Sequence, residues 1–269
     1  MAVTYIENKI IGNTTDITPA TFSDDFTGSD GWAEVGTPDT YVDTSADELV
    51  VKMDRNGTNN KCVYDLGTGN VSDSKWVLRY NQVNFSNTGS TNALGYSGIS
   101  SVSQSSGQTT APQDFIGMIW NDNGEVDYYG TVYNNDSGNG LTTGQNSAWN
   151  GSYAAQQNFD FQTSTDYWIE ISRINTSEMR IRCFSDSFHH MLFEMKQPIP
   201  VGVTGLRYIT FFNRMDTTGD VPIAFKVQKV EFWNNVSSVN KPLNASIGTI
   251  FIEVDTGKQY IFDGTDWKL

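Results

Sequence analysis

Short apolar runs rich in Val, Ile, Phe, Tyr and Trp recur along the whole chain, and clusters of Gly, Asn, Asp and Ser separate them. No apolar pattern with the 3.6-residue period of a helix continues beyond about two turns, so the runs are typical of β-strands. This feature favours an all-β chain. The clearest strands are expected at residues 48–54, 61–67, 75–85, 115–122, 126–134, 167–175, 178–186, 207–215 and 222–235.

The segment YWIEISRINTSEMRIRCFSD indicates how such strands pair. Tyr167, Ile169 and Ile171 alternate with more polar residues, and INTSE supplies a turn into the next strand. This pattern predicts an antiparallel hairpin with one face in the core. Strands that turn back repeatedly without helical crossovers favour a two-sheet sandwich or jelly roll over a parallel sheet.

The charge balance argues against two classes of partner. The chain has 269 residues, 31 of them acidic and 17 basic, and its net charge is -14. Such a surface repels phosphate backbones and anionic lipids, so we expect neither nucleic acid nor a membrane as a partner. No run approaches the roughly 20 apolar residues that span a bilayer, and MAVTYIENKIIGNTTDITPATF does not resemble a secretory signal peptide.

Cys62 and Cys183 are the two cysteines of the chain. Without an export signal, two thiols are more typical of buried, reduced cysteines than of a disulfide framework.

Two long polar segments interrupt the expected strands. Residues 86–113 contain no charged residue, and residues 134–158 contain only Asp136. Loops of this length are usually functional or disordered, so each is expected to be a solvated loop or a polar surface for a glycan or a neighbouring subunit.

The start of the chain has no strong periodicity. We expect an N-terminal arm at 1–21, a sandwich at 22–239, and a linker with a C-terminal hairpin at 240–269.

The order of motifs in the central part resembles the concanavalin A-like lectin/glucanase jelly rolls. The resemblance runs from FSDDFTGSDGW through the hairpin above to ITFFNRMDTTGDVPIAFKVQKVEFWNN, across residues 22–236. It implies an antiparallel two-sheet jelly-roll sandwich. It also implies that the first strand, near Asp25 and Phe26, lies beside the last strand, at 225–233.

The tail GTIFIEVDTGKQYIFDGTDW predicts a β-hairpin followed by a tight turn, because Gly257 and the Asp263-Gly264 pair suit the two reversals. It resembles a short module of tailed-phage virion proteins. A lone hairpin is marginally stable, so this one is expected to pack on the sandwich or on another subunit. The candidate assembly residues are Ile250, Phe251, Ile252, Tyr260, Phe262 and Trp267.

Enzymatic activity is not expected. Glucanases of the jelly-roll family carry a Glu-x-Asp-x-x-Glu strand motif whose carboxylates act as nucleophile and acid/base. The nearest match is GEVDYYG, in which Glu125 and Asp127 are present but Gly130 replaces the last glutamate. The adjacent His189 and His190 fall on opposite faces of a strand and are better explained by a loop or strand edge.

Aromatic residues beside Asp and Asn form a candidate glycan-binding surface, because aromatic faces stack on sugars and amide or carboxylate groups bond to hydroxyls. The alternative is that these rings pack the sandwich. The candidates are Trp120, Asp127, Tyr129 and Tyr133 on strands, and Tyr96, Trp149 and Tyr153 in loops.

Clustered oxygen ligands make a structural calcium ion the candidate cofactor of this chain. The candidate ligands are Asp24, Asp25, Asp216 and Asp220. The alternative is that these aspartates only form turns.

Together these features lead us to expect a non-enzymatic structural protein of a tailed-phage virion, such as a head decoration, head fibre or tail attachment subunit. It would assemble in the host cytoplasm as a homo-oligomer with other virion subunits. The alternative is a carbohydrate-binding adhesion module that recognises a host-surface glycan.

Overall fold

The computed structural model of the chain describes its residues in separate ranges. These are 9–10, 20–28, 31–35, 40–52, 61–86, 93–103, 114–122, 126–133, 156–158, 164–188, 191–215, 224–236, 248, 250–252, 259–263 and 267–268. Within these ranges every regular element is a β-strand. The all-β prediction is therefore confirmed.

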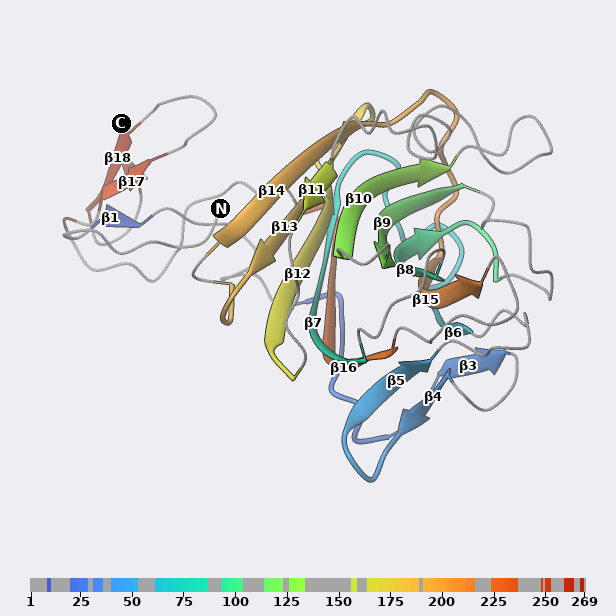
Figure 1. Cartoon of the computed structure of the whole chain (residues 1–269). Helices are drawn as coiled ribbons and strands as arrows, with labels where there is room; N and C mark the ends of the chain where they lie inside the picture. Colours follow the sequence, from blue (N-terminus) through green and yellow to red (C-terminus); the bar gives the residue numbers. More distant parts are fainter. Residues whose placement is uncertain are drawn as a thin grey trace.

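Two antiparallel sheets face one another in a sandwich (Figure 1). The seven-stranded sheet has the order β11 (Gln156–Asn158), β10 (Val126–Tyr133), β9 (Phe115–Asp122), β8 (Ala93–Ser100), β15 (Tyr208–Met215), β6 (Lys61–Asp65), β3 (Trp32–Val35). The eight-stranded sheet has the order β14 (Met191–Pro198), β13 (Glu178–Phe184), β12 (Asp166–Arg173), β7 (Trp76–Ser86), β16 (Ala224–Asn234), β5 (Glu48–Lys52), β4 (Thr40–Asp43), and β2 (Phe22–Asp24) also pairs with β16.

The pairing of β2 with β16 joins the first and last strands of the sandwich, as the jelly-roll resemblance implied. Phe22 is opposite Phe232 in this register, and Asp25 and Phe26 follow directly after β2. The predicted hairpin is also confirmed, since β12 pairs with β13 and Ile171 lies opposite Ile181.

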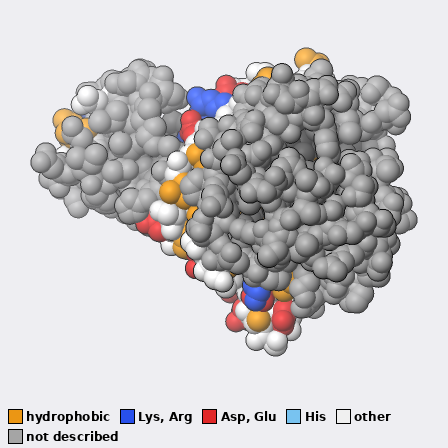
Figure 2. Space-filling view, in the orientation of Figure 1, with side chains coloured by type: hydrophobic (Ala, Val, Ile, Leu, Met, Phe, Trp, Pro, Cys, Tyr) orange, Lys and Arg blue, Asp and Glu red, His pale blue; other side chains and the backbone are white. Residues whose placement is uncertain are grey.

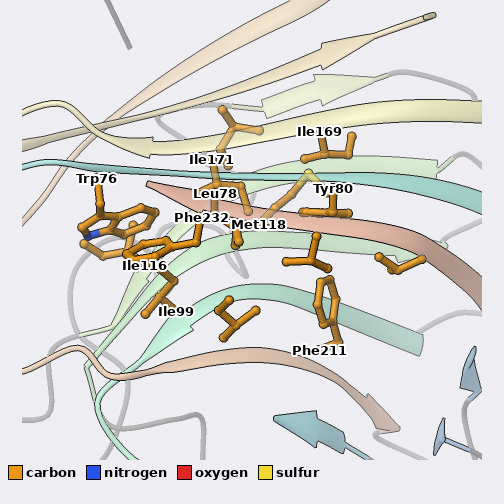
Figure 3. Close-up of a cluster of buried hydrophobic side chains, with 14 of the residues drawn as sticks. Trp76, Leu78, Tyr80, Ile99, Ile116, Met118, Ile169, Ile171, Phe211 and Phe232 are labelled. Carbon is orange, nitrogen blue, oxygen red and sulfur yellow. The ribbon is translucent and has the colours of Figure 1, made fainter. Parts of the chain in front are cut away.

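The core lies between the sheets (Figure 3). One sheet contributes alternate residues of β7, β12 and β16, and the other contributes residues of β8, β9 and β15. The labelled members are Trp76, Leu78, Tyr80, Ile169, Ile171 and Phe232 from the first sheet and Ile99, Ile116, Met118 and Phe211 from the second. Burying each large apolar side chain contributes about 1.5–3 kcal/mol, so these layers hold the sandwich together.

Cys62 and Cys183 lie in the same core as free, buried thiols. Burial raises the pKa of both thiols well above the usual value. The predicted burial of both cysteines is confirmed.

The expectation of one continuous loop over residues 86–113 is wrong, because Ala93–Ser100 forms β8 between β9 and β15. The glycine content that is typical of a loop has a packing role here. A Cβ atom on Gly98 would lie 2.3 Å from the Ile116 carbonyl oxygen and 2.8 Å from Cζ of Phe115. The strand therefore needs a glycine where a ring and a neighbouring backbone approach closely.

The tail forms a third, smaller sheet with part of the N-terminal arm. Its strand order is β1 (Lys9–Ile10), β17 (Ile250–Ile252), β18 (Gln259–Phe262), β19 (Trp267–Lys268). β17 and β18 form the expected hairpin, with Phe251 opposite Tyr260, and β1 pairs with β17 in parallel. In Figure 1 this sheet lies to one side of the sandwich. The hairpin therefore has the arm as a hydrogen-bonded neighbour.

Candidate functional site

The glycan-binding candidates of the seven-stranded sheet are only partly described. Trp120 lies in β9, and Asp127, Tyr129 and Tyr133 lie in β10, but their side chains are outside the described part of the structure. In the register Trp120 is opposite Tyr128. Its strand position is therefore on one face of the sheet, and the positions of the three β10 candidates are on the other face. Trp149 and Tyr153 lie outside the described residues.

Tyr96 is not an exposed loop residue, so that expectation is wrong. It lies in β8 and is 1% exposed. Its ring makes an edge-to-face contact with Phe115, with the centroids 6.3 Å apart. A ring held in this way is not available to stack on a sugar.

The candidate calcium ligands Asp24 and Asp25 make local hydrogen bonds. Asp24 accepts from the Trp32 indole Nε1 at 2.8 Å and from the Phe26 amide at 2.7 Å. Asp25 accepts from the Thr27 hydroxyl at 3.0 Å. Asp216 and Asp220 lie outside the described residues. Among the residues that are described, no group of three or more His, Cys, Asp or Glu side chains could hold a metal ion.

The candidate assembly residues lie in the small sheet. Tyr260 and Phe262 are buried in β18, whereas Ile250 in β17 is half-buried. Between the two buried rings, Ile261 is 54% exposed. Phe251, Ile252 and Trp267 occupy strand positions, and their side chains are outside the described part.

A pocket of about 400 Å³ opens on the outer face of the eight-stranded sheet. Asn81 of β7 and Trp168 of β12 line it beside three residues of β16, and the turn after β13 adds Ser187 and Phe188. The three strands are neighbours in the order β12-β7-β16. No local motif marks this pocket, because its residues come from distant parts of the chain.

Buried ion pairs form the floor beside this pocket. Arg79 donates from Nε to Glu170 Oε2 at 2.8 Å, and Arg182 Nη1 lies 3.2 Å from Glu170 Oε1. Arg182 Nε also lies 2.8 Å from Glu194 Oε2. Burial alone would raise the pKa of Glu170, but the charges of the two arginines outweigh it and lower that pKa. The floor is therefore a fully charged, hydrogen-bonded platform.

Phe188 is held in an unusual conformation at the wall of the pocket. Its φ is 66°, in the left-handed region that bulky residues rarely adopt. The Arg79 guanidinium carbon lies 4.3 Å from its ring centroid, and Phe184 contacts it edge-on at 5.5 Å. A strained residue persists only where the surrounding structure holds it, and such residues cluster at functional sites.

The opposite wall is polar. Asn81 Nδ2 donates to Gln228 Oε1 at 3.0 Å, and the backbone N–H of Gln228 donates to Asn81 Oδ1 at 2.8 Å. These bonds use the Gln228 Oε1 atom, so its Nε2 donor remains for a ligand. Lys229 and Glu231 form an ion pair of 2.8 Å at the rim. The pocket thus combines aromatic rings with fixed amide groups.

A group of acidic side chains lies apart from the pocket, at the turn between β4 and β5. In Figure 2 acidic side chains gather at the lower tip of the molecule, over the turn between β4 and β5. Asp43 in this turn accepts from the Ser45 amide at 3.0 Å and from its hydroxyl at 2.6 Å. This carboxylate therefore stabilises the turn.

The described part of the chain also contains no helix that is long and apolar enough to cross a membrane.

Comparisons with known proteins support the fold. No protein-family model and no curated protein sequence matches the chain. Among solved structures, peanut lectin with a 9mer peptide (PVIWSSATG) has a TM-score of 0.54 and 7% identity, and the match covers 78% of this chain and 95% of that chain. Lectin II from Ulex europaeus has a TM-score of 0.54 and 11% identity, and the match covers 79% of this chain and 97% of that chain.

A third solved structure is the Emp47p carbohydrate recognition domain, with a TM-score of 0.53, 12% identity, and coverage of 79% of this chain and 95% of that chain. At such identities the similarity shows the fold. The chain therefore has a concanavalin A-like jelly-roll fold.

Proposed function

We propose that this protein is a carbohydrate-binding module and that the pocket on the eight-stranded sheet is its binding site. The observation that carries the proposal is the combination of Trp168 and Phe188 rings with the fixed Asn81–Gln228 amide pair in one pocket. Two of the similar solved structures are lectins by name, and the third is a carbohydrate recognition domain.

The roles of the residues follow from their chemistry. The Trp168 ring is the expected stacking surface for the apolar face of a pyranose, and the Gln228 amide is the expected donor to a hydroxyl. The ion pairs beneath keep Phe188 in place through its contact with Arg79. A volume of about 400 Å³ lies within the range of small-ligand sites.

Binding without turnover fits this pocket best. Glu170 beside the floor is bound by two arginines, and Glu231 at the rim is bound by Lys229. The arginines lower the pKa of Glu170 and so keep it ionised, whereas glycoside hydrolysis needs one protonated acid.

A glycan array followed by calorimetry tests the proposal. We expect Trp168→Ala to weaken binding of the best array ligand at least about tenfold, or about 1.4 kcal/mol. Leu192→Ala is the control, because Leu192 is an apolar residue of the same sheet that is 39% exposed and does not line the pocket. Equal affinities of the two variants, or an array without a ligand in calcium and in EDTA, would overturn the proposal.

We propose assembly in a virion as the second candidate function, with the small sheet as the attachment element. The observation that favours it is the separate sheet of arm and tail, which presents the exposed Ile261. The resemblance of the tail to a phage virion module supports the partner class, namely other virion subunits.

Light scattering on a sizing column tests this second proposal with the full chain. We expect a defined oligomer that Ile261→Asp dissociates. Val201→Asp is the matched control, because Val201 is a 96% exposed apolar residue of the sandwich. A monomeric wild-type protein, or an oligomer that tolerates Ile261→Asp, would contradict it.

A further inference from the structure

A second pocket, of about 320 Å³, lies where β2, β6 and β16 meet, so residues of both sheets line it. Phe22 comes from β2, Tyr64 from β6, Asn70 from the turn after β6, and Asn234 from the end of β16. The pocket also contacts Phe232, a core residue. Glu231 of the first pocket is adjacent to Phe232, and neighbouring residues of a strand point to opposite faces. The two pockets therefore lie on opposite sides of β16.

The aromatic wall of this second pocket is rigid. Phe22 and Tyr64 are stacked with their ring centroids 4.0 Å apart. Gly31 packs against Tyr64, since a Cβ atom there would lie 2.6 Å from Tyr64 Cε2. Trp32 also contacts Tyr64, at 5.5 Å between centroids. The Tyr64 hydroxyl is thus fixed in position before any ligand arrives.

Two asparagine side chains have their amide orientation fixed by the backbone. Asn234 Oδ1 accepts from the Ser72 and Asn235 amides at 2.8 and 3.0 Å. Asn70 Nδ2 donates to the Leu66 carbonyl at 2.8 Å. Asn234 Nδ2 is therefore left as a donor group, and Asn70 Oδ1 is left as an acceptor. Neither atom, nor the Tyr64 hydroxyl, has a hydrogen-bond partner among the described residues.

The acidic residue at this pocket is already neutralised. Asp65 receives two hydrogen bonds from Arg207, at 2.6 and 2.5 Å. The hydrogen bond from Arg207 holds the pKa of Asp65 below its usual value. No uncompensated charge therefore faces a ligand there, and the chemistry suits an uncharged molecule.

From these observations we infer a second saccharide subsite, which takes a neutral pyranose between the aromatic wall and the two asparagines. One free donor, one free acceptor and one hydroxyl match the adjacent hydroxyl groups of such a ring. The inference rests on the proposed function for the class of ligand, but it concerns different residues. Two subsites on one chain would make it bivalent for a glycan surface and increase avidity.

The test is an NMR titration of the full chain with the methyl glycosides of glucose, galactose, mannose and N-acetylglucosamine. In a Trp168→Ala background, we expect at least one glycoside still to bind. Adding Tyr64→Phe, which keeps the ring and removes its hydroxyl, should weaken that binding about two- to tenfold, the equivalent of one hydrogen bond. Tyr208→Phe is the control, because Tyr208 lines neither pocket.

The outcomes separate the two proposals. Loss of all binding on Trp168→Ala alone would support the first pocket and overturn the second. Binding that is unaffected by Trp168→Ala but weakened by Tyr64→Phe would support the second and overturn the first. Binding that neither variant changes, or no binding by the wild-type chain, would overturn both. A melting temperature equal to that of Tyr208→Phe would show that Tyr64→Phe leaves the fold intact.

Discussion

Arg79 and Glu170 form a buried ion pair on the outer face of the eight-stranded sheet, with Arg79 Nη2 2.8 Å from Glu170 Oε2 and the side chains 5% and 0% exposed. The two residues are directly opposite in the register of β7 and β12. Arg182 adds a second cation to the same carboxylate. The three side chains thus link the neighbouring strands β7, β12 and β13 beside the first pocket.

Replacing this carboxylate should destabilise the sandwich strongly. Glu170→Gln would leave two buried guanidinium groups without their counter-charge, and breaking a buried pair in this way costs about 3–5 kcal/mol. Urea unfolding measures the effect. Glu194→Gln is the control, because its side chain is 25% exposed and water can replace part of the interaction. Equal losses for the two variants would contradict the importance of burial.

Acid should destabilise the protein through the same carboxylates. Burial raises the pKa values of Glu170 and Glu194, but their arginine partners outweigh this and lower both below the ordinary 4.5. A lowered folded-state pKa gives stability that is present above the unfolded value and lost as pH falls through the folded value. We expect the urea concentration at the unfolding midpoint to decrease as the pH is lowered below about 4.5. The decrease should be less steep in Glu170→Gln. Parallel profiles of the two proteins would refute this assignment.

Lys61 should also make stability rise with pH, but in an alkaline range. It is 2% exposed at the start of β6, and burial lowers its pKa from 10.5 to about 8. Because the unfolded chain holds this proton more tightly, stability should rise with pH between those two values. Lys61→Met should raise the urea midpoint at pH 7 and remove this part of the rise. The exposed Lys196→Met should do neither, and identical behaviour of the two variants would disprove the prediction.

Much of the fold could be predicted from local patterns. Alternation in the hairpin of β12 and β13 identified the core residues Ile169 and Ile171, and both are fully buried. The tail hairpin followed from its turn residues. By contrast, β8 was missed because its glycines, small residues and Tyr96 do not form an apolar run. Its place between β9 and β15 depends on contacts that are distant in sequence.

Neither candidate pocket could be found by such reasoning. Asn81, Trp168 and Gln228 meet because β12, β7 and β16 are neighbours, and local sequence does not give the order of strands. The outward residues of β12, including Glu170, looked like an ordinary polar face. Their burial depends on arginines from two other strands.

Gly117 gives the sharpest test of packing on the seven-stranded sheet. A Cβ atom there would lie 2.3 Å from both Phe115 Cζ and the Ser97 carbonyl oxygen. Gly117→Ala would therefore force the ring and the backbone of β8 to move, and overpacking of this kind costs about 1–3 kcal/mol. Gly28→Ala is the matched control, because nothing lies within 4 Å of a Cβ atom at that position. Urea unfolding should show a lower midpoint for Gly117→Ala and almost no change for Gly28→Ala. Two equal midpoints would mean that the ring of Phe115 does not rest on this glycine.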